Sequence, residues 1–116
     1  MADSLADLTL ALRAFAAERD WEVYHSPKNL AMALTGEAGE LAAEFQWLTE
    51  AESRDLAPAH LERVRQEAAD VLLYLTRLAD RLDFDLVEAA RAKMVLNAAR
   101  YPADKARGNA RKYGEL

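Results

Sequence analysis

Hydrophobic residues recur every three or four positions along most of this chain, which is the spacing of one face of an α-helix. Ser4, Ser26 and Asp85 stand where helices are expected to begin, and their side-chain oxygens suit the N-cap position. Between and after the helices lie a polar connection at residues 48–57 and a basic tail that starts at Pro102. The spacing predicts four long helices, at residues 5–20, 27–47, 58–81 and 86–101.

No segment shows the strict alternation of apolar and polar residues that marks a half-buried strand. Glycine and proline are scarce, with 4 and 3 residues, which also favours helices. The sequence therefore predicts an all-α fold, a four-helix bundle that forms one domain over residues 1–116.

The second predicted helix carries acidic residues on the face that would normally be apolar. At ~100° per residue, Leu30 and Leu41 lie within ~40° of Glu37 around the helix axis. Glu40 and Glu44 lie within ~60° of Glu37 on the other side. The acids thus border or share the stripe that is expected to face the core.

The third predicted helix repeats this arrangement. Val71 lies within ~60° of Glu67 on one side, and Asp70 and Tyr74 lie within ~60° on the other. Each helix therefore presents two carboxylates three residues apart, and such residues share a face. If the two helices pack antiparallel, the four carboxylates converge.

Partly buried carboxylates are costly unless protons, cationic side chains or a metal ion neutralise them. Oxygen ligands without histidine or cysteine suit Mg²⁺ or Mn²⁺. Ion pairs with Arg or Lys from another helix are the main alternative, and a single pair of this kind usually lies on a solvated surface.

Composition excludes several classes of function. The net charge is −5, so nonspecific binding to a nucleic-acid polymer through a basic surface is not expected, although metal ions can bridge acidic residues to an anionic ligand. There is no cysteine, which excludes disulfides and thiolate chemistry and suits a reducing cytoplasm. We expect neither a signal peptide nor a membrane span, because no basic leader and no run of ~18 apolar residues occurs.

The segments "GEAGELAAEFQW" and "EAADVLLYL" resemble the E-x-x-E and E-x-x-D signature of the all-α nucleoside triphosphate pyrophosphohydrolases, the MazG-like superfamily. Longer stretches, "FAAERDWEVYHSPKNLAMALTGEAGELAAEFQW" and "KMVLNAARYPADKARGNARKYGEL", resemble the dCTP pyrophosphatase branch. The resemblance extends from about Leu8 to Tyr113.

This resemblance implies a Mg²⁺-dependent enzyme, with Mn²⁺ as a substitute, that cleaves a nucleoside triphosphate between its α and β phosphates. It also implies that Glu37, Glu40, Glu67 and Asp70 bind the metal. One carboxylate would act as general base, and the sequence leaves Glu37 and Glu40 as alternatives. No glycine-rich phosphate loop is present, so P-loop chemistry is not expected.

The resemblance assigns the triphosphate to a strip on the fourth predicted helix and to the tail. Lys93, Asn97 and Arg100 share one helix face, and Lys112 with Tyr113 matches the closing "KY" of the family. Lysine and arginine form charge-assisted bonds with phosphate. The alternative is an ordinary solvated helix face.

Trp21, His25 and Trp47 are the candidates for a base pocket, because aromatic faces stack on nucleobases at ~1–3 kcal/mol each. The alternatives are core packing for the tryptophans and a local hydrogen bond for His25. Tyr74 either bonds a sugar or metal ligand or belongs to the core.

Animal members of the branch tend to carry histidine where this chain has Leu12, which leaves the base preference open. The first expectation is dCTP or a modified dCTP, and dUTP, dTTP or a broad range of bases are alternatives.

Two other classes of function compete with hydrolysis. A di-metal bundle of the ferritin type needs E-x-x-H pairs, and neither acidic pair contains histidine. A non-enzymatic helical binding module shares the fold. The family is oligomeric, commonly a dimer of dimers, and the broad apolar faces of these helices agree with homo-oligomer formation. In such an assembly, a pocket can include residues from more than one chain.

Overall fold

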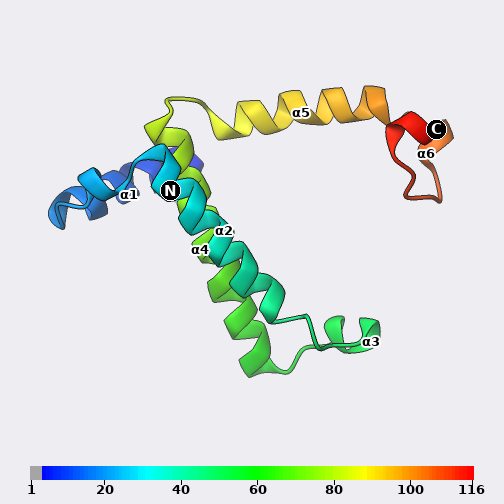
Figure 1. The fold of residues 1–116 in the computed structure, drawn as a ribbon, viewed down its shortest axis with the longest axis horizontal. Helices are drawn as coiled ribbons and strands as arrows, with labels where there is room; N and C mark the ends of the chain where they lie inside the picture. Colours follow the sequence, from blue (N-terminus) through cyan, green and yellow to red (C-terminus); the bar gives the residue numbers. More distant parts are fainter. Residues whose placement is uncertain (1–3) are drawn as a thin grey trace. The chain divides into compact units, whose positions relative to one another are not determined.

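The computed structural model describes residues 4–116, and these residues form helices joined by turns and loops (Figure 1). No strand occurs within this range. The all-α prediction and the four long helices are thus confirmed. The long helices are α1 (Leu5–Glu18), α2 (Pro27–Ala43), α4 (Pro58–Arg81) and α5 (Leu86–Arg100). The short ones are η1 (Glu22–Tyr24), α3 (Glu50–Ser53), α6 (Ala103–Ala106) and η2 (Tyr113–Glu115).

Three of the long helices begin at the predicted caps. The side-chain oxygens of Ser4, Ser26 and Asp85 accept the backbone N–H three residues ahead, over 3.1, 3.2 and 3.0 Å. These bonds satisfy donors that have no partner inside the helix. α4 begins at Pro58, whose ring already has the φ angle of a first helical residue.

The prediction for the end of α2 is wrong, because the helix stops at Ala43 rather than at residue 47. The Nε2–H of His60 donates to the carbonyl oxygen of Glu44 over 2.7 Å, and the His60 ring lies 6.4 Å from that of Phe45. This bond from α4 satisfies a carbonyl at the helix end. Trp47 therefore lies in the turn after α2 and not on the helix.

α1 also ends earlier than predicted, at Glu18. Asp20 has a φ angle of 54°, in the left-handed region, where the chain cannot continue a right-handed helix. The chain then turns through η1 into α2, which brings Trp21 and His25 next to each other.

The chain divides into two compact units, residues 1–83 and 84–116. In the first unit, α2 lies along α4, and α1 also packs against α4 (Figure 1). The side chains of Leu30, Ala16 and Ala79 are buried at these contacts. The second unit contains α5, α6 and η2, and α5 has no buried residue. The single domain expected from the sequence stays a prediction.

None of the helices within residues 4–116 combines the length and the apolar content that a membrane span requires.

Leu30 has a relative accessibility of only 1%, so its replacement tests the contact between α2 and α4. We expect Leu30→Ala to lower the free energy of unfolding by ~2–5 kcal/mol, because the smaller side chain leaves a cavity. Urea denaturation followed by circular dichroism measures this change. Lys28→Ala, at an exposed position of the same helix, is the control and should change stability by less than ~0.5 kcal/mol. Equal stability of the two variants would contradict the packing described here.

Candidate active site

Three carboxylates meet where α2 and α4 lie side by side. One oxygen from each of Glu37, Glu67 and Asp70 lies within 4.8 Å of the other two. Glu37 comes from α2, on the face that also carries the buried Leu30, and the other two come from α4. The antiparallel convergence considered in the sequence analysis thus occurs within one chain for three of the four acids.

Two of these carboxylates have an oxygen that is buried and lacks a hydrogen-bond partner. These atoms are Oε2 of Glu37 and Oε2 of Glu67. A buried oxygen without a partner loses its bonds to water and gains nothing in return, which costs about 1–3 kcal/mol or more for a charged group. The arrangement is therefore incomplete without protons or a cation.

Burial and the neighbouring carboxylate of Glu40 raise the pKa of Glu37 to about 7, and the charges of Asp70 and Glu67 add to the effect. Burial also raises the pKa of Glu67, again with Glu40 as the main neighbouring group. Glu40 is exposed and stands outside the group of three oxygens. It nevertheless lies close enough to act on both.

The ion-pair alternative fails within the described residues. No salt bridge among residues 4–116 joins Glu37, Glu40, Glu67 or Asp70 to a cationic side chain. The nearby Glu44 has such partners in His60 and Arg63, so cations are available on α4 but do not reach the cluster. An all-carboxylate set with unpartnered oxygens fits Mg²⁺ or Mn²⁺.

A pocket of about 240 Å³ opens beside the carboxylates. Asp70 belongs to both, so the acidic cluster and the pocket are continuous. Three of the residues expected to contact substrate line it, namely Trp21, His25 and Tyr74. The remaining lining residues are Leu12, Phe15, Leu30, Leu73 and Arg77.

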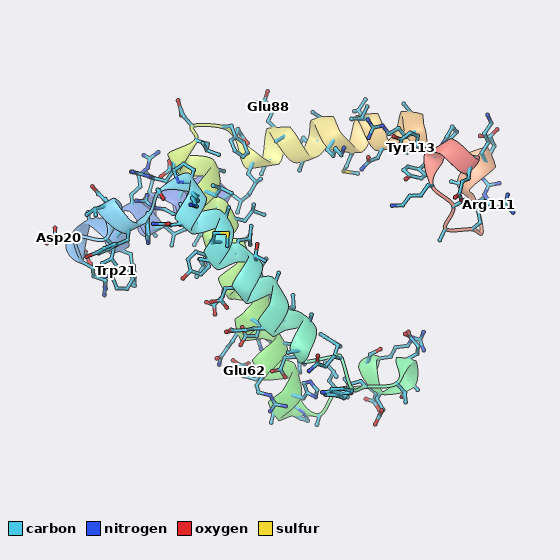
Figure 2. The ribbon with its side chains drawn as sticks, viewed as in Figure 1. Asp20, Trp21, Glu62, Glu88, Arg111 and Tyr113 are labelled. Carbon is cyan, nitrogen blue, oxygen red and sulfur yellow. The ribbon has the colours of Figure 1, made fainter. Side chains whose placement is uncertain are left out.

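Aromatic edges form one wall of this pocket. The Trp21 ring meets the Phe15 ring edge-on at a centroid distance of 5.7 Å, and it meets the His25 ring edge-on at 6.3 Å. Figure 2 labels Trp21 beside Asp20, in the segment that follows α1. Phe15 and Arg77 were missed by the sequence analysis, because nothing in their local sequence distinguishes them from ordinary helix residues.

Trp47 does not line this pocket. Its side chain is 87% exposed, in the turn after α2. Its role in base binding stays a prediction. This exposure leaves most of the apolar surface of the Trp47 ring open to solvent.

The residues expected to bind phosphate belong to the second unit. There, the Arg100 guanidinium lies 5.0 Å from the centre of the Tyr113 ring, a cation–π contact. Tyr101 meets the same ring edge-on at 6.0 Å. The tail therefore folds back onto the end of α5, where Figure 2 labels Tyr113. Lys112 directly precedes η2. The phosphate contacts of this group, which also includes Lys93 and Asn97, stay a prediction.

Comparison with known proteins agrees with this geometry. The model of the MazG-like family matches residues 33–116. The chain belongs to the MazG-like family. Within it, the sequence is 47% identical to human dCTP pyrophosphatase 1 and 46% identical to the rat protein of that name, over 97% of this chain and 68% of theirs.

The fold of this MazG-like chain is also found in a solved structure. A pyrophosphatase from Archaeoglobus fulgidus superposes with a TM-score of 0.80 at 37% sequence identity. The match covers 84% of this chain and 92% of the archaeal one. The names of these relatives, together with the acidic cluster, point to the use of a divalent metal ion by this MazG-like chain.

The raised pKa of Glu37 gives a test in the metal-free protein. At Glu37 the native state binds a proton more tightly than the unfolded chain, so the stabilisation from this group is greatest below its ordinary pKa and is lost as the pH rises through about 7. The lowered pKa of His25 acts in the opposite direction, so we expect the melting temperature to fall between about pH 5 and pH 8 relative to that of Glu37→Gln, which keeps His25, and Mg²⁺ to restore it mainly at the upper end.

Glu37→Gln is the matched control for this measurement, because it keeps the shape and removes the ionisation. The variant lacks the loss of stability caused by Glu37 and should respond less to Mg²⁺. A wild-type melting temperature that does not fall relative to that of Glu37→Gln over this pH range, or that ignores Mg²⁺ at pH 8, would contradict the unpaired state of these carboxylates.

Proposed function

We propose that this protein is a Mg²⁺-dependent pyrophosphohydrolase that converts dCTP, or a modified dCTP, to the monophosphate and pyrophosphate. The observation that carries the proposal is the group of three carboxylates without cationic partners, continuous with a largely apolar pocket. The names of the relatives, dCTP pyrophosphatase 1, support the same substrate. In the cell, such an activity would remove unwanted nucleotides in the cytoplasm.

Glu37, Glu67 and Asp70 would hold the metal, with Glu40 as the fourth acid from the same two helices. A divalent ion held there supplies neutralisation of phosphate charge and a lower pKa for bound water. With Mn²⁺ the same oxygen ligands would serve.

The reaction adds the oxygen of one water molecule to the α-phosphorus and breaks the bond from that phosphorus to the oxygen bridging to the β-phosphate. The leaving group is pyrophosphate, and the proton from water needs an acceptor. Glu37 and Glu40 are the two candidates for this acceptor. Glu40 stands outside the group of three oxygens that would hold the metal, but close enough to act on Glu37 and Glu67.

The pocket beside Asp70 would hold the base. Trp21 offers an aromatic surface, His25 and Tyr74 offer polar groups, and the other walls are mainly apolar. Leu12 lines the same pocket, so the residue at this position bears directly on base preference. Cleavage of dUTP, dTTP or a broad range of triphosphates would keep the mechanism and change only the pocket assignment.

The triphosphate would bind the cationic strip of α5 and the tail. Arg100 and Lys112 would contact phosphate oxygens, and the contact of Arg100 with Tyr113 would hold its guanidinium in place. Lys93 and Asn97 share the α5 face with Arg100 by their spacing.

A homo-oligomer, a dimer of dimers, is part of the proposal. Several large apolar side chains are more than two-thirds exposed in the single chain, including Trp47, Met94 and Val95. Association would bury such surface, and the site would then include residues of a second chain. Trp47 is the strongest candidate for a residue that acts in a neighbouring site.

Replacing the acids of α4 tests the reaction. We expect Glu67→Gln and Asp70→Asn each to lower kcat/KM for dCTP by ~100-fold or more, because the metal loses a charged ligand. Separation of the products after incubation with Mg²⁺ and each nucleotide measures this and identifies the bond that is cleaved. The expected products are dCMP and pyrophosphate, without orthophosphate.

The matched control is Glu62→Gln on the same helix, at an exposed glutamate outside the cluster (Figure 2). It should retain wild-type activity. Wild-type turnover in both cluster variants would contradict the proposed site. Absence of turnover with every nucleotide, with Mn²⁺ also tried, would favour a binding module instead.

Light scattering after size-exclusion chromatography tests the assembly. We expect a mass that is a multiple of the 12.9 kDa chain, with a tetramer as the main species. Val95→Glu should shift the distribution towards smaller species, because it places a charge on the exposed apolar face of α5. A monomeric wild-type protein that is fully active would contradict the oligomeric site.

A further inference from the structure

Arg77 is a charged residue in the interior of the first unit. Its side chain is only 5% exposed, and it lies on α4 seven residues after Asp70, on the same helix face. A buried guanidinium stays charged, so its burial is tolerated only where its donors are well paired. The partners of its hydrogen bonds therefore show what allows Arg77 to be buried.

Asp80 pairs the charge of Arg77. The Nη1–H of Arg77 donates to Oδ2 of Asp80 over 3.2 Å. Arg13 of α1 donates to the same carboxylate through Nε, over 2.9 Å, and through Nη2, over 2.6 Å. The hydrogen bonds from Arg13 are the main cause that keeps the pKa of Asp80 below its usual range, so this carboxylate is ionised. The ion pair with Asp80 thus fixes the Nη1 end of the Arg77 guanidinium.

The Nε–H of Arg77 is directed to His25. It donates to Nδ1 of the imidazole over 3.2 Å. A guanidinium has no acceptor, so Nδ1 must be unprotonated to take this bond. A neutral imidazole then carries its one proton on Nε2, which becomes a donor.

Two further observations hold His25 in this form. Burial and the positive charges of Arg77 and Arg81 lower its pKa, so the doubly protonated ring is disfavoured. Arg81 also donates from Nε to the backbone carbonyl of His25 over 3.1 Å, which fixes the backbone that carries the ring. The imidazole is therefore constrained in position, charge and tautomer.

His25 lines the proposed base pocket, where most neighbouring side chains are apolar. In such a wall, one donor of fixed identity discriminates strongly between ligands, because a mismatched polar group is left unpaired. Cytosine, uracil and thymine all present an acceptor at O2, so only N3 distinguishes them on this edge. N3 is an acceptor in cytosine, whereas in uracil and thymine it carries a proton and is a donor.

We propose that Arg77 is a positioning residue for base selection, which holds His25 as the Nε2–H tautomer so that His25 donates to N3 of the cytosine ring. This inference rests on the proposed function. Arg77 itself does not need to touch the nucleotide. We therefore expect selectivity for cytosine over uracil to depend on Arg77, although its own hydrogen bonds go to His25 and Asp80.

The tautomer can be measured without activity. Long-range ¹H–¹⁵N correlation spectra of the labelled full chain distinguish a protonated from an unprotonated Nδ1. The chain has 2 histidines, and His60→Gln assigns the signals. We expect His25 to show an unprotonated Nδ1 and a protonated Nε2 in the wild type, and a mixture of forms in Arg77→Met. An Nδ1–H form in the wild type, or unchanged signals in the variant, would overturn the link.

Selectivity is measured as the ratio of kcat/KM for dCTP to that for dUTP. We expect Arg77→Met to lower this ratio by ~10-fold, the effect of one mispaired hydrogen bond. Arg63→Met, at an exposed arginine of the same helix, should leave the ratio unchanged. An unchanged ratio in a folded Arg77→Met protein would mean that Arg77 only stabilises the fold.

His25→Phe provides a second route that keeps a ring and leaves Arg77 in place. It should lower the ratio at least as far as Arg77→Met does, because it removes the donor completely, and the double variant should be no less selective than His25→Phe alone. Additive losses would overturn the proposal. If the wild type cleaves no triphosphate, the proposed function is wrong, and the role of Arg77 in base selection is wrong with it. The spectra still show whether Arg77 fixes the tautomer of His25.

Discussion

Repulsion between carboxylates in the seam of α2 and α4 is the constraint on which the rest of this protein depends. Glu37 and Glu67 occupy positions where apolar residues would have stabilised the contact, and each has a buried oxygen without a partner. The seam therefore stores unfavourable energy that a cation can relieve. The apolar positions on either side, such as Leu30, must hold the two helices together despite this repulsion.

One face of α4 contributes both to the acidic cluster and to the lining of the pocket. Residues at intervals of three or four form one stripe on this face, namely Glu67, Asp70, Tyr74 and Arg77. The stripe extends over ~15 Å, at 1.5 Å per residue. Along this stripe, Asp70 belongs both to the acidic cluster and to the lining of the pocket. Arg77, which is hydrogen-bonded to His25, lies at the far end of the stripe. A single rigid element thus fixes the spacing between the expected site of chemistry and the expected site of base binding.

Much of this arrangement could be predicted from the sequence, and the features that could not be predicted have a common cause. Helical periodicity placed Glu37 and Glu67 on the apolar stripe, and Ser26 marked the start of α2, because both signals are local. The end of α2 was mispredicted because His60, 16 residues away, caps the carbonyl of Glu44. The bond between Arg77 and His25 spans 52 residues. Such contacts leave no periodic signal, since they depend on how the helices pack.

The unpaired acids of the seam also bear on how such a chain changes over generations. Leucine at the position of Glu37 would extend the apolar stripe and end the repulsion, so an apolar replacement there would make the protein more stable and less able to hold a cation. A lineage released from selection for the site would drift towards that apolar sequence. Acids in an otherwise apolar seam are therefore expected to last only while selection acts on the site, because the fold alone would be more stable without them.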